Sequence, residues 1–171
     1  MRVATLFKRL LRLGRERVVG VELEEDEGGI ERVVVTVALR PRRVSRCSGC
    51  ARRSRSIYDS RPGSWRHLDM GRVRCLIRAE VRRVACPSCG VRTEAVPWAR
   101  AGSRFTRAFE DTCVYLVKHA PKSTVAALMR IDWATVGRMI ERVVTEHQAS
   151  QPGDGMDGLS RIGIDEVAYR K

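Results

Sequence analysis

The chain has 171 residues, of which 43% are hydrophobic, so it can bury the core of one ordinary domain or of two to three small ones. It contains no run of 18 apolar residues, and charges interrupt its first apolar stretch, which argues against a transmembrane helix and a secretory signal peptide. We therefore expect a cytoplasmic protein without a membrane partner, whose six cysteines are metal ligands or buried thiols rather than disulfides.

The formal net charge of +13 is concentrated in one part of the chain. Residues 1–39 are neutral overall and residues 108–171 carry a net charge of −1, whereas residues 40–107 carry 18 arginines and four acidic residues. A patch of this kind attracts polyanions, of which nucleic acid is the most common. The alternative is an arginine-rich surface that is only solvated, but the concentration in one segment favours nucleic acid.

Residues 1–39 predict a small α/β cap of no evident chemistry. A short amphipathic helix is expected over residues 4–13, with Leu6, Leu10 and Leu13 on its apolar side and Gly14 at its end. Two strands follow at residues 18–23 and 30–39, on either side of an acidic turn.

Two C-x2-C pairs form the strongest motif, and 35 residues separate them. Four thiolates can complete the tetrahedral shell of Zn²⁺, so we expect a structural zinc ion on Cys47, Cys50, Cys86 and Cys89. The spacer is longer than in common zinc patterns and implies a finger with an inserted arm. The alternatives are four ordinary reduced cysteines or a thioredoxin-like redox pair, although a redox pair normally begins a helix in a βαβ unit.

The residues that follow the two pairs differ. Gly90 relieves the backbone behind the second pair, and Pro87 sets its turn. Ala51 stands behind the first pair, where a glycine would be expected.

The inserted arm alternates between apolar and mostly basic positions, as a strand with two different faces does. The apolar face contains Cys75, which we interpret as a core thiol. A partner strand is expected from Trp65 to Met70, with a turn at Gly71. His67 is assigned to phosphate or packing contacts rather than to zinc. The basic face predicts DNA contacts by four arginines: Arg72, Arg74, Arg78 and Arg82.

Residues 103–148 predict three helices. The first spans residues 105–118, Ser123 caps a short second helix over 124–130, and Asp132 caps a third that begins at Trp133. A short helix, a tight turn and a longer helix are typical of the helix-turn-helix, whose last helix enters the DNA major groove. A plain helical bundle is the alternative. On the third helix an inward stripe of Val136, Ile140 and Val143 lies beside the predicted DNA-contacting face of Thr135, Arg138 and Arg142.

Residues 149–160 predict a linker rich in glycine. Ile162 and Ile164 then suggest a buried strand with Asp165 at its exit, where a carboxylate can hold Mg²⁺. Alone this signal is weak, because an aspartate often only ends a strand.

Taken together, these parts resemble the amino-terminal portion of bacterial insertion-sequence transposases of the ISL-three family, from about residue 5 to the last residue. The motifs that carry the resemblance are Trp65-Arg-His-Leu-Asp69, Arg82-Arg-Val-Ala-Cys-Pro-Ser-Cys-Gly-Val91, Thr93-Glu-Ala-Val-Pro-Trp-Ala99, Ser103-Arg-Phe-Thr106 and Ile162-Gly-Ile-Asp-Glu-Val-Ala-Tyr-Arg-Lys171.

The resemblance implies an α+β chain of several parts: a cap (1–39), a zinc ribbon-like β module (40–100), a helix-turn-helix (103–148), a linker (149–160) and the first strand of a truncated RNase H-like domain (161–171). It also implies that Asp165 is the first catalytic carboxylate of a DDE site. The second aspartate and the glutamate are absent here, so we expect no catalysis by this chain alone, and Mg²⁺ only in a complete catalytic domain.

Two functions remain open. One is the front end of a transposase, which binds double-stranded element-end DNA in the bacterial nucleoid and pairs with itself or with the full-length enzyme. The other is a stand-alone zinc and helix-turn-helix regulator, or a decoy of the full transposase. The DNA sequence after codon 171 discriminates between them, since an open or shifted frame favours the first and a clean stop favours the second.

Overall fold

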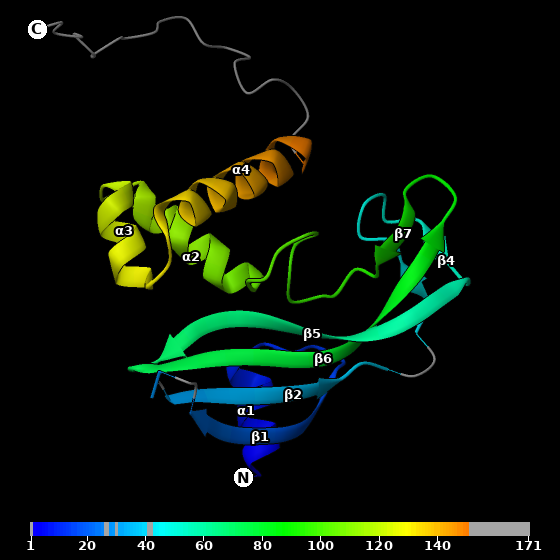
Figure 1. Cartoon of the computed structure of the whole chain (residues 1–171), viewed down its shortest axis with the longest axis horizontal. Coiled ribbons are helices and arrows are strands. Elements are labelled where there is room, and N and C mark those ends of the chain that lie inside the picture. The colour runs from blue at the N-terminus through cyan, green and yellow to red at the C-terminus, as the bar shows by residue number, and fades with distance from the viewer. Residues whose placement is uncertain (1, 26–27, 30, 41–42, 151–171) are drawn as a thin grey trace, which may run out of the picture.

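The computed structural model describes residues 2–25, 28–29, 31–40 and 43–150. These residues form four helices and seven strands (Figure 1). In chain order the elements are α1 (Val3–Leu10), β1 (Arg17–Glu25), β2 (Glu31–Ala38), β3 (Ser45–Arg46), β4 (Arg53–Ser54), β5 (Ile57–Met70), β6 (Val73–Cys86), β7 (Gly90–Thr93), α2 (Arg107–Val117), α3 (Lys122–Met129) and α4 (Trp133–Ser150). None of the helices in these described segments is long and apolar enough to cross a membrane.

The main sheet has the strand order β1-β2-β6-β5, and β7 pairs with the far end of β6. β5 and β6 form the long antiparallel arm that the alternating sequence predicts, although β5 begins at Ile57, well before the expected start at Trp65. β2 pairs with β6 in parallel, so the sheet crosses the boundary that we expected between residues 39 and 40. The amino-terminal strands are therefore continuous with the arm.

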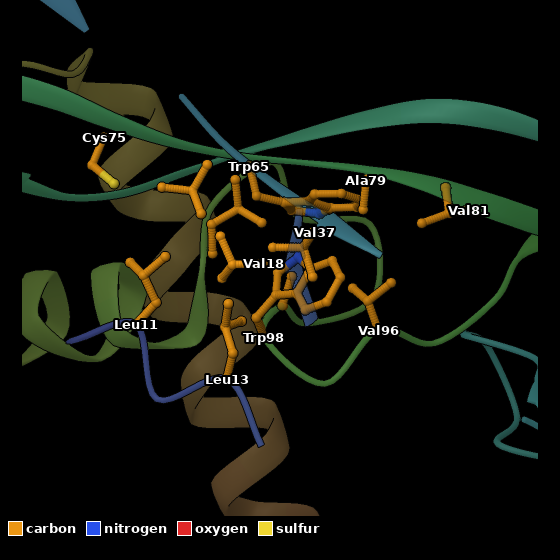
Figure 2. Packing of buried hydrophobic residues seen from close by; sticks show 13 residues of the cluster. Leu11, Leu13, Val18, Val37, Trp65, Cys75, Ala79, Val81, Val96 and Trp98 are labelled. Atoms are coloured by element: carbon orange, nitrogen blue, oxygen red, sulfur yellow. The ribbon is translucent and has the colours of Figure 1, made fainter. Parts of the chain in front are cut away.

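One apolar core lies on a single face of this sheet (Figure 2). Cys75, Ile77 and Val81 of β6 point into it, as their alternation predicts, together with Val35 and Val37 of β2. The Trp65 and Trp98 rings meet edge to face, with centroids 5.4 Å apart. Burial raises the pKa of Cys75 to about 11, which agrees with its interpretation as a protonated core thiol.

The helix α1 differs from its prediction in length and in the side that it buries. It ends at Leu10, and Arg12 just beyond it has a positive φ of 49°. Ala4 and Phe7 pack against the sheet core, whereas Leu6 and Leu10 are 37% and 55% exposed. The predicted apolar side is therefore divided, since Leu13 beyond the helix is buried in the core whereas Leu6 and Leu10 are not.

The three carboxy-terminal helices enclose a second core. The predicted cap of α4 is confirmed, since Asp132 accepts a hydrogen bond from the Thr135 amide at 2.7 Å. The predicted cap of α3 was wrong: α3 begins two residues earlier than expected, Pro121 is its N-cap residue, and Ser123 lies inside the helix. Proline fits there because its fixed φ suits the entry to a helix.

The second core lies beside the free edge of β5. The amide of Arg66 donates to the Arg104 carbonyl, and the Thr106 amide donates back to the Arg66 carbonyl, both at 2.9 Å. Thr106 then caps α2 through its hydroxyl, to which His67 is hydrogen-bonded at 2.9 Å. Main-chain hydrogen bonds between β5 and the segment that precedes α2 therefore attach the helices to the arm.

Candidate metal centre and nucleic-acid interface

Both cysteine pairs meet at the end of the arm. The sulfur atoms of Cys47, Cys50, Cys86 and Cys89 all lie within 4.8 Å of one another, and those of Cys50 and Cys86 are 3.5 Å apart. A tetrahedral zinc ion with Zn–S bonds of about 2.3 Å holds its sulfurs about 3.8 Å apart. The four thiols therefore fit a structural Zn²⁺ in number, type and spacing. Cys75 and His67 lie outside this cluster.

Short strands hold the cluster in place. β3 pairs with β4 around the first cysteine pair, and β6 pairs with β7 around the second. An isolated bridge between Cys47 and Glu94 joins the two halves. The Glu94 carboxylate is buried beneath them and is bound by Arg43 and by the Ser45 hydroxyl. The arrangement is that of a ribbon of two knuckles, here called the zinc ribbon (residues 43–58 and 84–94).

The backbone behind each pair has the conformation that the sequence suggests. Gly90 has a φ of 71° and Ala51 a φ of 57°, so both lie in the left-handed region. This region suits glycine and strains other residues. The expectation of a glycine-like position at Ala51 is therefore confirmed.

The thiols are not equivalent in acidity. The pKa of Cys86 is lowered to about 7, chiefly because the main chain of Ser88 hydrogen-bonds to its sulfur. The pKa of Cys89 is raised to about 12, chiefly because of its hydrogen bond with Cys50. Four neighbouring thiolates repel one another, so full ionisation of the cluster requires a cation at its centre.

The predicted phosphate-contacting arginines of the arm lie in different settings. Arg78 forms a bidentate pair with Glu24 of β1, at 2.6 and 2.9 Å. Arg74 and Arg82 are half-buried, and Arg72 is exposed at the β5–β6 turn, where its carbonyl accepts from Arg130. The acidic partner of Arg78 could not be anticipated, because it lies 54 residues away in the chain.

The predicted reading face of α4 is divided in the structure. The Arg138 side chain is 60% exposed, and its Nη2 donates to Thr135 Oγ1 at 2.7 Å. Thr135 is itself buried and bonds Asp132, so these residues orient Arg138 toward solvent. Trp133, which is 60% exposed, adds an aromatic ring at the start of the helix, covered by the ammonium of Lys122 at 3.2 Å from its centroid.

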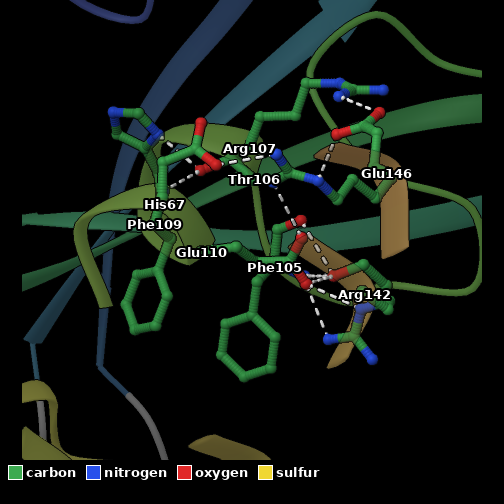
Figure 3. Close-up of polar contacts among 11 residues, drawn as sticks. His67, Phe105, Thr106, Arg107, Phe109, Glu110, Arg142 and Glu146 are labelled. Carbon is green, nitrogen blue, oxygen red and sulfur yellow. Dashed lines mark hydrogen bonds and ion pairs between the residues drawn. The ribbon is translucent and has the colours of Figure 1, made fainter. Parts of the chain in front are cut away.

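Arg142 points the other way, into the helical core (Figure 3). Its Nε and Nη2 donate to one oxygen of the fully buried Glu110, at 2.9 and 2.6 Å. Ser103 donates to the same oxygen, and Arg100 donates to the other. Arg100 also binds Glu146 and Asp111. The structure thus gives Arg142 a partner within the chain. Of the two α4 arginines that we predicted to contact DNA, only Arg138 lies on the surface.

Asp165, together with the rest of residues 151–171, lies outside the described residues. The expected linker beyond residue 150 and the expected first strand of an RNase H-like domain belong to this segment.

The described part of the chain contains a zinc ribbon that a β arm joins to a helix-turn-helix. This combination defines a class of protein with a zinc ribbon and a helical domain of a DNA-binding type.

Comparison with known families agrees with this architecture. Residues 43–94 match the zinc-finger of transposase IS204/IS1001/IS1096/IS1165, and residues 94–144 match the helix-turn-helix domain of transposase family ISL3. The chain belongs to the ISL3 (ISL-three) transposase family.

Curated relatives extend the likeness beyond these two regions. The chain is 40% identical over 175 aligned positions to the transposase for insertion sequence element IS1557 of Mycobacterium tuberculosis, in the CDC 1551 / Oshkosh and H37Rv strains alike. The alignment covers 100% of this chain and 39% of each relative. No solved structure matches the chain significantly.

Proposed function

We propose that this chain is the DNA-binding front end of an insertion-sequence transposase and that it recognises the end of its element. The observation that carries the proposal is the exposed amino-terminal part of α4, where Arg138 is oriented by Thr135 and the Trp133 ring is also exposed. The amino-terminal residues of the last helix in a helix-turn-helix are those that contact base edges.

In this proposal the four cysteines hold one Zn²⁺, which fixes the ribbon and carries out no chemistry. Cys47, Cys50, Cys86 and Cys89 would be its ligands, because they supply a complete tetrahedral set of thiolates. The ribbon and the arm contribute affinity for phosphate through their arginines, and α4 contributes base discrimination. Arg72 remains a proposed contact of the arm, since its side chain is exposed.

The test compares a duplex carrying the terminal sequence of the element that encodes the chain with a random duplex of equal length. The unmodified, zinc-loaded chain is expected to prefer the terminal duplex. Arg138→Ala should reduce this preference by about 1–3 kcal/mol if the guanidinium makes a bidentate contact to a base. Arg9→Ala, an exposed arginine on α1, is the matched control and should retain the preference. Equal affinity of the unmodified chain for both duplexes would overturn the proposal.

We further propose that a polypeptide of residues 1–171 binds DNA without cutting it. Two-metal phosphoryl chemistry needs several convergent carboxylates, and the family resemblance assigns Asp165 as the first of three. The polypeptide should shift the terminal duplex in Mg²⁺ or Mn²⁺ and leave it intact on a sequencing gel. Nicking that disappears in Asp165→Ala would contradict the proposal.

A further inference from the structure

The zinc ribbon presents a group of arginines that has no acidic neighbour in sequence. No aspartate or glutamate occurs in residues 44–58 or 86–93. The adjoining carboxylates are engaged, since Glu94 is buried against Arg43 and Asp59 pairs with Arg83. All members of the group are exposed, and we call it the knuckle patch: Arg46, Arg52, Arg53, Arg55 and Arg92.

The knuckle patch differs from the arm in the groups that its side chains contact. On the arm, Arg78 and Arg83 form ion pairs with Glu24 and Asp59. On the knuckles, Arg46 donates to the Ala51 carbonyl and Arg92 to the Cys89 carbonyl, both neutral acceptors. A phosphate must displace a carboxylate from the arm arginines but only a carbonyl or water from the knuckles. The knuckle arginines are therefore more available to phosphate than Arg78 and Arg83 of the arm.

The location of the knuckle patch relative to α4 follows from the arm. At one end of the arm, Arg130 binds Asp69 and the Arg72 carbonyl, and α4 begins three residues later. The zinc ribbon lies at the other end, where β6 finishes at Cys86 (Figure 1). β6 has 14 residues. At about 3.3 Å per residue it spans roughly 45 Å, which exceeds the pitch of B-DNA of about 34–36 Å.

We propose that the knuckle patch binds the phosphate backbone of duplex DNA about one helical turn from the bases that α4 contacts. The chain would then have a two-part footprint, with sequence reading at one end of the arm and a sequence-independent grip at the other. This inference rests on the proposed function for its α4 half. The part of the inference that concerns the knuckle patch does not rest on it, because that part describes only the affinity of the ribbon for the phosphate backbone of duplex DNA.

The first experiment measures binding of a random 40-base-pair duplex at several salt concentrations. The triple variant Arg52→Gln, Arg53→Gln, Arg55→Gln is compared with the control Arg9→Gln, Arg15→Gln, Arg17→Gln. The control removes the same charge from exposed positions in α1, in β1 and in the segment between them. Each lost phosphate contact lowers the slope of log K against log salt by about 0.9. The slope of log K against log salt should therefore fall by about 2–3 in the knuckle variant, whereas the control should keep the full slope. Zinc content of each variant verifies that the ribbon remains folded.

The second experiment is a hydroxyl-radical footprint on a 60-base-pair duplex that carries the terminal sequence of the element. The knuckle variant should lose protection about one turn away from the segment that Arg138→Ala affects, and it should keep protection at that segment. Equal slope losses in the knuckle variant and its control, or a stronger effect on RNA of equal length than on DNA, would overturn the inference. Failure of the unmodified chain to discriminate the terminal duplex would instead overturn the proposed function, because the slope on random DNA does not depend on it.

Discussion

Arg66 of β5 closes the carboxyl end of α3 by donating from Nη1 to the carbonyl of Arg130 at 2.9 Å. The same guanidinium donates to the Met129 carbonyl and to Asp69, and it lies 5.1 Å from the centroid of the Phe109 ring. The last carbonyls of a helix lack partners within the helix and favour a nearby cation. Arg66 therefore joins the sheet to the helix-turn-helix at a point that packing alone would leave polar and unsatisfied.

Replacement of one zinc ligand should remove the metal and unfold the ribbon. We expect about one zinc per unmodified chain and none in Cys86→Ser, because a site with three thiolates loses much of its affinity and folding of such a ribbon is coupled to metal binding. The control is Cys75→Ala, which removes a buried thiol outside the cluster and should keep zinc. Metal analysis of the purified proteins measures both, and full zinc content in Cys86→Ser would contradict the ligand assignment.

Removal of the Glu110 carboxylate should destabilise the helical part strongly. Glu110→Ala leaves Arg142 without its buried counterion and removes one of the three carboxylates that bind Arg100. Loss of one partner of a buried ion pair costs about 3–5 kcal/mol. Glu141→Ala, at an exposed position of α4, should change stability by less than about 0.5 kcal/mol. Urea unfolding followed by circular dichroism gives both values. A loss below about 1 kcal/mol for Glu110→Ala would show that the network contributes little.

A glycine at position 51 should stabilise the ribbon. The left-handed conformation of Ala51 costs an L-residue about 1–2 kcal/mol, and the larger unfolded-state entropy of glycine offsets part of this gain. We expect Ala51→Gly to raise the free energy of unfolding by about 0.5–1 kcal/mol. Ala134→Gly, at an exposed position of α4, should lower it by about 1 kcal/mol. Parallel denaturant titrations of zinc-loaded protein decide the sign, and a loss of stability in Ala51→Gly would contradict the strain argument.

His67 should make stability depend on pH in the mildly acidic range. Burial lowers its pKa below the usual value, so the folded chain favours the neutral ring that bonds Thr106. A group with a lowered folded-state pKa stabilises the fold above its unfolded-state pKa of about 6.5, and this contribution fades as the pH falls through the folded-state value. The unmodified chain should therefore lose more stability than His67→Gln between pH 7.5 and pH 6. Parallel pH curves for the two proteins would refute this role for His67.

Local sequence patterns predicted the features that depend on neighbouring residues. The alternation along β6 placed Cys75 and Ile77 in the core, the knuckle spacing predicted the cysteine cluster, and Asp132 was identified as a cap. The cluster follows from the need of Zn²⁺ for four ligands, whereas the core positions and the cap follow from side-chain periodicity or turn chemistry within a few residues. The strained backbone at Ala51 was visible for the same reason.

Features that depend on distant residues were missed. The inward orientation of Arg142 is set by Glu110, which lies 32 residues earlier in the chain, and helical spacing alone cannot reveal such a counterion. Met139 is fully buried although the predicted inward stripe omitted it. The knuckle patch carried no motif of its own, and only the pairing of the arm arginines with carboxylates distinguished it.

The parallel pairing of β2 with β6 determines when the sheet can be completed during synthesis. β6 lies between β2 and β5, and both of these neighbours leave the ribosome before it. At about 5–20 residues per second, the roughly 40 residues between the end of β2 and the middle of β6 take about 2–8 seconds to synthesise. During this interval β2 has no pairing partner on its β6 side, so Val35 and Val37 reach their buried positions in the core only after β6 has been synthesised.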